Sequence, residues 1–366
     1  MAGSGFGTNF RITTWGETHG AGVGVVVDGC PAGLPLERED VQKYLDRRKP
    51  GQSKYTTQRK EGDQVEILSG IFEGRTTGTP ISMVVYNKDQ RSKDYSNIKD
   101  IYRPGHADFT FDMKYGFRDY RGGGRSSGRK TIGRVAAGAV AAKVLKELGI
   151  EIKAYAKAIA GIEVSKDHFD FAEMNNNPFN MPDKEAAKLV QEKADQMIKE
   201  MDSIGGIIEC QITGMPVGIG ETVFDKLDAE LSKAIMSIGS VKGFEIGDGF
   251  EAANLRGSEN NDDFICVDGK VEKETNHSGG VLGGMSDGSA IVFRAAIKPT
   301  PSIAQTQKTV NRDLDNVEIE IHGRHDPMIV PRAVVVVESM AAVTILDGVL
   351  KNLGATMDNI KKIYGE

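Results

Sequence analysis

Two histidines lie in glycine-flanked segments, where an imidazole can reach a reacting group. His19 is in WGETHGAG and His106 is in RPGHAD, and a third, His325, precedes Asp326 in GRHDPMIVPRA. An imidazole exchanges a proton near neutral pH, and a neighbouring anion raises its pKa. These segments therefore predict proton transfer beside an anionic group. Either of the first two histidines, taken alone, also fits a residue that only packs or hydrogen-bonds.

Positive charge is concentrated in two stretches of a chain whose formal net charge is −6. Residues 103–134 carry eight Lys/Arg and three Asp, and residues 47–60 carry six Lys/Arg and no acidic residue, which leaves −17 on the rest. Cations repel one another strongly where water is excluded. Interleaved with Gly, Ser and Thr, the two stretches favour a site for several phosphates over two solvated loops. We expect several of these charges to be neutralised only by bound ligands.

The tract RGGGRSSGRKT, residues 121–131, combines backbone N–H groups, three hydroxyls and four cations immediately before a helical pattern. Glycines that lead into a helix form a natural phosphate cradle. The Walker sequence GxxxxGK[ST] is absent, and GAGVG at 20–24 is only a weak match to a dinucleotide motif. An Arg-Gly segment that binds RNA is an alternative, but the tract is short and the chain is acidic.

Several other classes of protein are disfavoured. The three cysteines are widely spaced and form no CxxC motif, which fits a reducing compartment and excludes a compact cysteine-based zinc site. Because no HxH or HxxxH pair supports a histidine site, we expect no metal. The most apolar run, 333–350, contains Glu338 and Asp347, which indicates a buried helix or strand–helix unit rather than a membrane span. With no secretory design at the N-terminus, we expect a cytoplasmic protein without a membrane partner.

Alternating and helical patterns both occur, which predicts a mixed α+β or α/β fold. Strands are expected at 9–15, 22–29, 64–72, 80–86, 207–214 and 290–297. Helices are expected at 133–150, 183–206, 224–239 and about 337–352. A strand–strand–helix rhythm recurs in the two halves, which is consistent with an internal duplication. Residues 165–185 are polar and read as a surface excursion.

Three long blocks carry a resemblance to a known family. GETHGAGVGVVVDGCPAGLPL, RPGHADFTFDMKYGFRDYRGGGRSSGRKT and GRHDPMIVPRAVVVVESM are similar to the signature blocks of chorismate synthases. The linking segments VKGFEIGDGF and NHSGGVLGG resemble the same family. The match runs from about residue 7 to residue 350 in the family's order.

This resemblance implies a carbon–oxygen lyase that converts 5-enolpyruvylshikimate 3-phosphate to chorismate and phosphate, the last step of the shikimate pathway. The reaction is an anti 1,4-elimination that needs reduced FMN without net redox change. NADPH would bind only if the enzyme reduces its own flavin. The resemblance also implies a β-α-β sandwich with helices between antiparallel sheets, one intertwined domain over residues 1–366, and a homotetramer without nucleic acid.

The resemblance assigns roles to individual residues. It implies that His19 protonates the departing phosphate, that His106 protonates the reduced flavin near N1, and that Asp326 manages the proton at flavin N5. The positions where the family contacts FMN are Arg125, Ser126, Ser127, Gly239, Ser240, Gly283, Lys298, Pro299, Thr300, Pro301, Ser302 and Arg324. The positions expected to face the substrate or a nicotinamide cofactor are Arg48, Lys54, Arg121 and Arg129, of which the last two are chosen for charge and location.

The chain departs from the family's common pattern at several of these positions. Thr18 stands where serine is usual, and Lys54 stands where arginine is usual. Gly128 and Lys130 replace the Ala and Glu of the common RSSARET, so Lys130 reverses a charge. Because every proposed proton-transfer group is present, these departures bear on affinity more than on activity. A stand-alone NAD(P)H-dependent flavin reductase is the second alternative.

Overall fold

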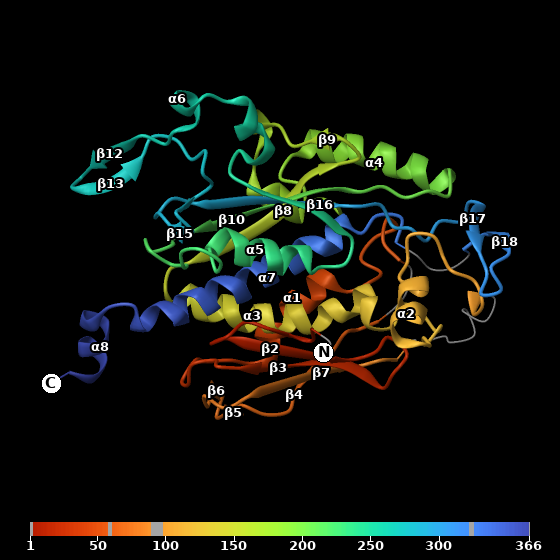
Figure 1. Cartoon of the computed structure of the whole chain (residues 1–366), viewed down its shortest axis with the longest axis horizontal. Helices are drawn as coiled ribbons and strands as arrows, with labels where there is room; N and C mark the ends of the chain where they lie inside the picture. Colours follow the sequence, from red (N-terminus) through yellow and green to blue (C-terminus); the bar gives the residue numbers. More distant parts are fainter. Residues whose placement is uncertain (1–2, 58–60, 89–97, 322–325, 366) are drawn as a thin grey trace.

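The computed structural model describes residues 3–57, 61–88, 98–321 and 326–365. Two five-stranded antiparallel sheets form the outer layers, and two layers of helices lie between them (Figure 1). One continuous hydrophobic cluster fills the space between the sheets. This is the predicted sandwich with helices between antiparallel sheets.

The first sheet is built from the N-terminal part of the chain. Its strands, in spatial order, are β1 (Gly5–Phe6), β2 (Arg11–Gly16), β3 (Gly22–Asp28), β7 (Ile81–Tyr86) and β4 (Val65–Ile67). The central strand β3, GVGVVVD, is buried along nearly its whole length. Val23, Val25 and Val27 share one face and are almost fully buried, as expected for a strand with one face on the core.

The second sheet follows the same plan in the C-terminal part. Its strands, in spatial order, are β9 (Ile162–Glu163), β8 (Glu151–Ile159), β10 (Gly206–Thr213), β16 (Ile291–Ile297) and β11 (Val241–Ile246). Strands β2-β3-β7-β4 of the first sheet correspond in spatial and chain order to β8-β10-β16-β11 of the second, while the edge strand β1 precedes β2 and the edge strand β9 follows β8. In both halves a long helix follows the third strand of this spatial order, β7 or β16. The fold therefore has the internal duplication that the sequence rhythm indicated.

Four helices occupy the interior: α1 (Arg38–Arg48), α3 (Thr131–Glu147), α5 (Leu227–Met236) and α7 (Val330–Lys351). Helices α3 and α7 cross where Gly138 faces Ser339, and a Cβ at Gly138 would stand 2.2 Å from that of Ser339. Only glycine permits this close approach. Helix α7 is apolar and long enough to cross a membrane, but it is the central core helix, with 83% of its most apolar window buried.

The remaining elements lie at the periphery. The helices are α2 (Asp108–Tyr115), α4 (Lys184–Lys199), α6 (Gly257–Asn260) and α8 (Met357–Tyr364). The hairpins are β5–β6 (Ile71–Phe72, Arg75–Thr76), β12–β13 (Phe264–Val267, Lys270–Lys273), β14–β15 (Val281–Leu282, Met285–Ser286) and β17–β18 (Gln307–Val310, Asn316–Ile319). Short 3-10 helices include η2 (Gly124–Ser126) and η3 (Gly128–Lys130), which lead into α3.

Three sequence predictions differ from the structure. The last helix begins at Val330 rather than near residue 337, because burial on all sides overrides the strand preference of its valine run. The expected strand 64–72 is broken into β4 and β5. The excursion at 165–185 is not wholly on the surface, because Phe179 and Met181 are fully buried.

Asp347 ties the N-terminal segment to the core helix α7. Its Oδ1 atom accepts hydrogen bonds from the backbone N–H groups of Thr8, Asn9 and Phe10, at 3.0, 2.6 and 2.9 Å. Alanine removes the carboxylate and leaves these three buried N–H donors without an acceptor. Asp347→Ala is therefore expected to lower the free energy of unfolding by about 3 kcal/mol. Urea denaturation measures this. The exposed Asp358→Ala is the control, and an equal effect of the two changes would contradict the role of Asp347.

Candidate active site

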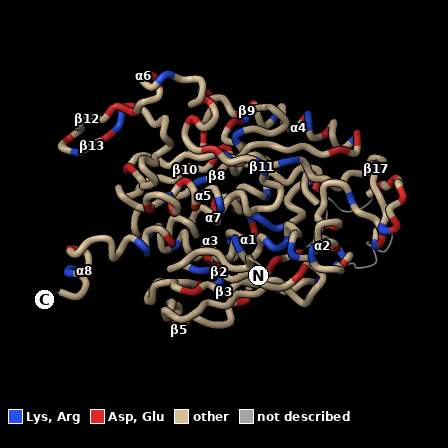
Figure 2. Tube along the Cα trace, viewed as in Figure 1, with Lys and Arg blue, Asp and Glu red and all other residues tan. Residues whose placement is uncertain are grey.

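Two equivalent connections between a strand and a helix build the site. One runs from the end of β7 to the start of α3, and the other from the end of β16 to the start of α7. The duplication brings these connections together, since Arg48 at the end of α1 contacts Thr131 of α3 and, through its carbonyl, Arg332 of α7. Lys and Arg positions gather here, between α1 and α2 (Figure 2).

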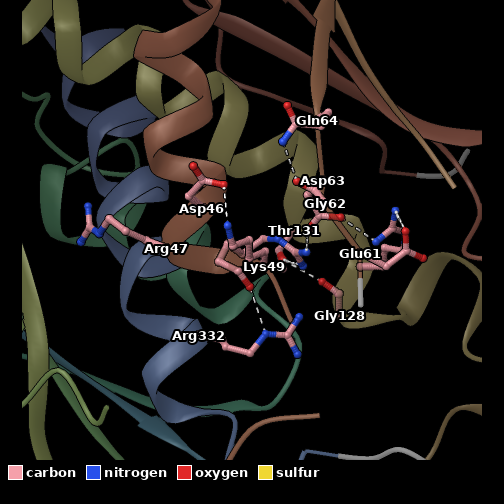
Figure 3. Close-up of polar contacts among 12 residues, drawn as sticks. Asp46, Arg47, Lys49, Glu61, Gly62, Asp63, Gln64, Gly128, Thr131 and Arg332 are labelled. Carbon is pink, nitrogen blue, oxygen red and sulfur yellow. Dashed lines mark hydrogen bonds and ion pairs between the residues drawn. The ribbon is translucent and has the colours of Figure 1, made fainter. Parts of the chain in front are cut away.

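Asp63 holds two of the predicted anion-binding residues in a buried network (Figure 3). One carboxylate oxygen pairs with Arg48, and the other accepts from Arg129 at 2.9 Å. The Arg48 side chain is only 2% exposed and that of Asp63 is fully buried. Arg129 also donates to Asn87 at 2.5 Å and lies 3.6 Å from Glu61. Arg47, by contrast, points away from this network and pairs with Glu338 at 2.7 Å.

The pKa values of both Asp63 and Arg48 are lowered in this network. Burial would raise the pKa of Asp63, but Arg48 and Arg129 outweigh it and hold the pKa below its usual range. Burial lowers the pKa of Arg48 to about 10, Asp63 opposes this, and Arg332 and Arg129 add to it. Arg48 remains a cation at neutral pH, and its Nε has no hydrogen-bond partner among the described residues. With Asp63 and Glu61 set against Arg48 and Arg129, the buried network is balanced in formal charge.

Asp326 is connected to Arg48 through Arg332. Its Oδ1 accepts from the Thr57 backbone N–H at 2.8 Å, and its Oδ2 accepts from Arg332 at 2.5 Å. Arg332 also donates to the Arg48 carbonyl at 3.0 Å. The structure thus links Asp326 to the buried cations through one arginine. The expectation that several charges of the basic stretches are neutralised only by bound ligands does not apply to Arg47, Arg48 and Arg129, each of which has an acidic partner.

His106 is held against the expected FMN residues of the second connection. Its Nε2 lies 2.9 Å from the Ser302 hydroxyl, and its Nδ1 lies 2.9 Å from the Pro104 carbonyl. Lys298 Nζ donates to the Gly105 carbonyl at 3.1 Å. A Cβ at Gly105, where φ is +67°, would stand 2.7 Å from Pro301. A glycine at 105 is therefore required for the two loops to meet.

The hydrogen bonds of His106 define its tautomer. A carbonyl only accepts, so Nδ1 carries the proton and donates to Pro104, while Nε2 accepts from Ser302. Burial lowers the pKa of His106, and the neighbouring cations Arg103 and Lys298 lower it further. In the ligand-free protein the imidazole is consequently neutral near pH 7, and it would gain a proton only beside an added anion.

Lys298→Met is expected to raise the pKa of His106 towards its ordinary value, because one of the cations that oppose its protonation is removed. Histidine titration by NMR measures this shift. The exposed Lys308→Met in the same connection is the matched control. An unchanged or lower pKa in Lys298→Met would show that this cation does not act on the imidazole.

The glycine tract joins the two connections. Arg125 turns inward and donates to Ser4 and to the Thr14 carbonyl, each at 3.0 Å. The Ser126 carbonyl lies 4.0 Å from where a Cβ would stand at Gly239, and it is the only described atom that close. Ser127 accepts from the Arg129 backbone at 3.3 Å. The backbone N–H of Lys298 donates to Ser240, whose φ of +73° is rare for a residue with a side chain.

This arrangement fits a flavin phosphate. Ser126, Gly239, Ser240, Lys298, Pro301 and Ser302 form a contiguous surface beside His106. Thr300 supplies a buried hydroxyl without a hydrogen-bond partner among the described residues, and its carbonyl accepts from Ser203 at 2.7 Å. Pro299 packs against Gly205 of the same neighbouring segment. Hydroxyls, a lysine and open glycine backbone are the groups that bind a phosphate.

His19 lies in the loop between β2 and β3, and its charge acts on Asp119. Asp119 also pairs with the exposed Arg121 at 2.8 Å. The neighbouring Thr18 is buried, and its hydroxyl has no hydrogen-bond partner in the described part of the chain. The glycine-flanked loop therefore places His19 near Asp119, just before the glycine tract 121–131.

Two predicted residues are not brought into this cluster. Lys54 is largely exposed and pairs at 2.8 Å with Asp195 of α4. Gly283 lies in the β14–β15 turn near the start of β16, whereas Lys298 follows its end, a strand length of roughly 23 Å away. Arg324 lies outside the described residues. No cluster of His, Cys, Asp or Glu in the described ranges could hold a metal ion.

Sequence reasoning missed Asp63, Glu61 and Arg332. The signal was present for the two acids, because EGD follows directly on the basic stretch 47–60. Acids next to a run of cations are candidates for their counter-charges. Arg332 had no such signal, because it stands far along the chain from Arg48.

The fold and the gathering of Lys and Arg positions at the site fit an enzyme whose ligands are anionic. The chorismate synthase family model matches residues 10–350, and the chain belongs to this family. It is 67% identical to the chorismate synthase of Lachnospira eligens, over 100% of both chains. It is 56% identical to that of Methanococcoides burtonii, over 96% of this chain and 97% of the relative.

A solved structure entitled "Crystal Structure of Chorismate Synthase" has the same fold. Its TM-score is 0.77 at 31% sequence identity, with 98% of this chain and 96% of the other covered. The family predicted from the three sequence blocks is confirmed, and with it the α+β sandwich. The RNA-binding and stand-alone reductase alternatives are not favoured.

Proposed function

We propose that this chorismate synthase family enzyme eliminates phosphate from 5-enolpyruvylshikimate 3-phosphate to give chorismate. The carbon–oxygen bond to phosphate breaks, a hydrogen leaves carbon 6, and a new double bond forms across the 1,4 system. The observation that carries the proposal is the meeting of two equivalent connections, which places His106 of one against Ser302 of the other. The substrate's phosphate and two carboxylates match the Lys and Arg positions that gather at these connections.

Reduced FMN is the cofactor we propose, held by Arg125, Ser126, Ser127, Gly239, Ser240 and the segment 298–302. When bound, the flavin supplies electron density to the substrate as phosphate leaves and recovers it when the hydrogen is lost. Gly283 and Arg324 remain predicted contacts. The open space beside Gly239 and the unpartnered Thr300 hydroxyl support this placement.

The chain's own groups hold and move the protons. We assign His19 to the departing phosphate, since a neutralised phosphate is a better leaving group. His106 receives a proton when an anion arrives beside it and donates it from the ring near flavin N1. Asp326, oriented by Arg332 and the Thr57 backbone, serves the proton at flavin N5. Arg48, Arg129 and Arg121 bind substrate anions, and Lys54 remains a predicted contact for substrate or nicotinamide cofactor.

The assembly and location follow the family expectation. We propose a homotetramer of one intertwined domain per chain in the cytoplasm, without nucleic-acid or membrane partners. The single hydrophobic cluster that joins both sheets supports one domain. NADPH is proposed as a ligand only if the enzyme reduces its own flavin.

An anaerobic assay tests the reaction. The protein is mixed with 5-enolpyruvylshikimate 3-phosphate and dithionite-reduced FMN, and chorismate and phosphate are followed. Equal amounts of both products, absent with oxidised FMN, are expected. Repeating the assay with NADPH and oxidised FMN decides whether the enzyme reduces its own flavin. No chorismate from folded, FMN-binding protein would refute the proposed reaction.

A further inference from the structure

Lys130 is a buried lysine whose charge has no partner. It is the last residue of η3, directly before α3, and its relative exposure is 9%. Its Nζ atom is buried from solvent and makes no hydrogen bond to the described residues. An ammonium without a partner is costly to bury. Other interior cations of the site, such as Arg48 and Arg129, do have a carboxylate. The ammonium of Lys130 therefore lacks a hydrogen-bond acceptor among the described residues.

The surroundings of Lys130 are short of negative charge. Arg125 of η2 disfavours its protonation, and Glu17, in the loop after β2, favours it without accepting a hydrogen bond. Thr18, which follows Glu17 directly, is 6% exposed and also has a hydroxyl without a partner among the described residues. The positive end of the α3 dipole adds to the same field. A buried, unpartnered ammonium at the start of a helix is suited to bind an oxyanion.

Burial is the main cause that lowers the pKa of Lys130, to about 8, with Arg125 adding to it and Glu17 opposing. The side chain is thus partly neutral in the ligand-free protein at mildly alkaline pH. A bound anion would restore the full charge, because an opposite charge favours the protonated form. Binding of the anion would then be coupled to uptake of a proton.

We propose that Lys130 is a phosphate-binding residue of this enzyme, and that its ammonium binds an oxygen of a phosphate monoester. The inference rests on the proposed function for the ligands it names, the substrate and FMN, each of which brings one such group. It concerns binding, so it is tested without turnover.

The test is calorimetry on the full chain at about pH 8, in two buffers of different ionisation enthalpy. FMN is titrated first, and 5-enolpyruvylshikimate 3-phosphate is then titrated into protein saturated with oxidised FMN. Wild type is expected to take up about half a proton more than K130R for the ligand that Lys130 binds. K130M is expected to weaken that ligand about 10- to 100-fold, the loss of one charge-assisted hydrogen bond. A phosphate monoester is already a dianion at this pH and takes up no proton itself.

The variants separate binding from folding. K130R keeps the charge, so its affinity should stay within a few fold of wild type, while the extra proton uptake disappears. K146M, an exposed lysine of the same helix, is the control for lost charge. A loss confined to the substrate assigns its phosphate to Lys130, and a loss confined to FMN assigns the flavin phosphate. Affinities within twofold of wild type for both ligands in K130M, with unchanged proton uptake, would overturn the proposal even if the elimination itself is confirmed.

Discussion

Asp63→Asn is expected to lower the free energy of unfolding by about 3–5 kcal/mol, the largest stability effect of any single change at the site. Asp63 is the carboxylate shared by Arg48 and Arg129, and its side chain has no exposed surface. Asparagine keeps the size but removes the charge. Two buried guanidinium groups are then left with only the more distant Glu61 beside them. Removing one partner of a buried pair costs far more than the pair contributes.

Denaturation by urea at pH 7 measures this effect. The matched control is Asp46→Asn on α1, whose partner Lys49 lies at 3.1 Å with both side chains about 40% exposed. Solvent screens that pair, so the control should change stability by less than about 1 kcal/mol. Equal changes in unfolding free energy for the two substitutions would show that burial of the Asp63 network does not increase its contribution to stability.

The pH dependence of the same variant has a definite sign. The folded-state pKa of Asp63 lies below its ordinary value, so its contribution is present above the ordinary carboxyl pKa and is lost as pH falls through the folded value. The stability difference between wild type and Asp63→Asn should therefore be full at pH 7 and shrink in acid. The KM for substrate should also rise more than kcat falls, because the two arginines that Asp63 positions are proposed to bind substrate.

The sequence allowed much of the site to be predicted. His19 and His106 stand in glycine-flanked loops, and the glycine tract leads directly into a helix, so local chemistry and local structure agree. The strand β3 was also predictable from its apolar run, and β10 and β16 from the alternation of residues that face the core with residues that do not. The two basic stretches indicated an anionic ligand, and the structure brings parts of both to one place.

What the sequence could not show was which charges meet. Arg48 and Arg129 are joined by Asp63, and Arg332 reaches Arg48 across 284 residues of chain. Such pairs depend on the tertiary fold and leave no periodic signal. The same limit applies to Lys130, whose missing partner is visible only when its neighbours are known. Propensity also misplaced the start of α7, since valine runs favour strands unless burial on all sides decides otherwise.

The duplication explains why the site lies where it does. In each half, β7 or β16 is followed by a connection to a long interior helix, and the crossing of α3 and α7 at Gly138 brings the starts of both helices to the same region. One connection supplies His106 and the glycine tract. The other supplies Ser302, Lys298 and Asp326. Neither half alone holds a histidine against a hydroxyl and a cationic network.

His106→Ala is expected to reduce turnover about 10²- to 10⁴-fold, the usual contribution of a proton-transfer residue. The pH profile carries the sharper test. Burial and nearby cations lower the pKa of His106 in the free protein. In a plot of kcat/KM against pH, the limb, or change in rate, caused by titration of His106 should therefore lie below the pH of an ordinary histidine. Beside an anionic ligand the imidazole holds its proton more tightly, so the corresponding kcat limb should lie at higher pH.

His168→Ala, in the exposed short helix after β9, is the matched control and should leave both limbs in place. In His106→Ala the separation between the two limbs should disappear together with the rate. If the separation persists in that variant, another group accepts the proton, and His106 only supports Ser302. Anion-driven protonation requires that the hydrogen bond to Pro104 stay donated from Nδ1, so that Nε2, now facing Ser302, becomes the atom that gains the proton.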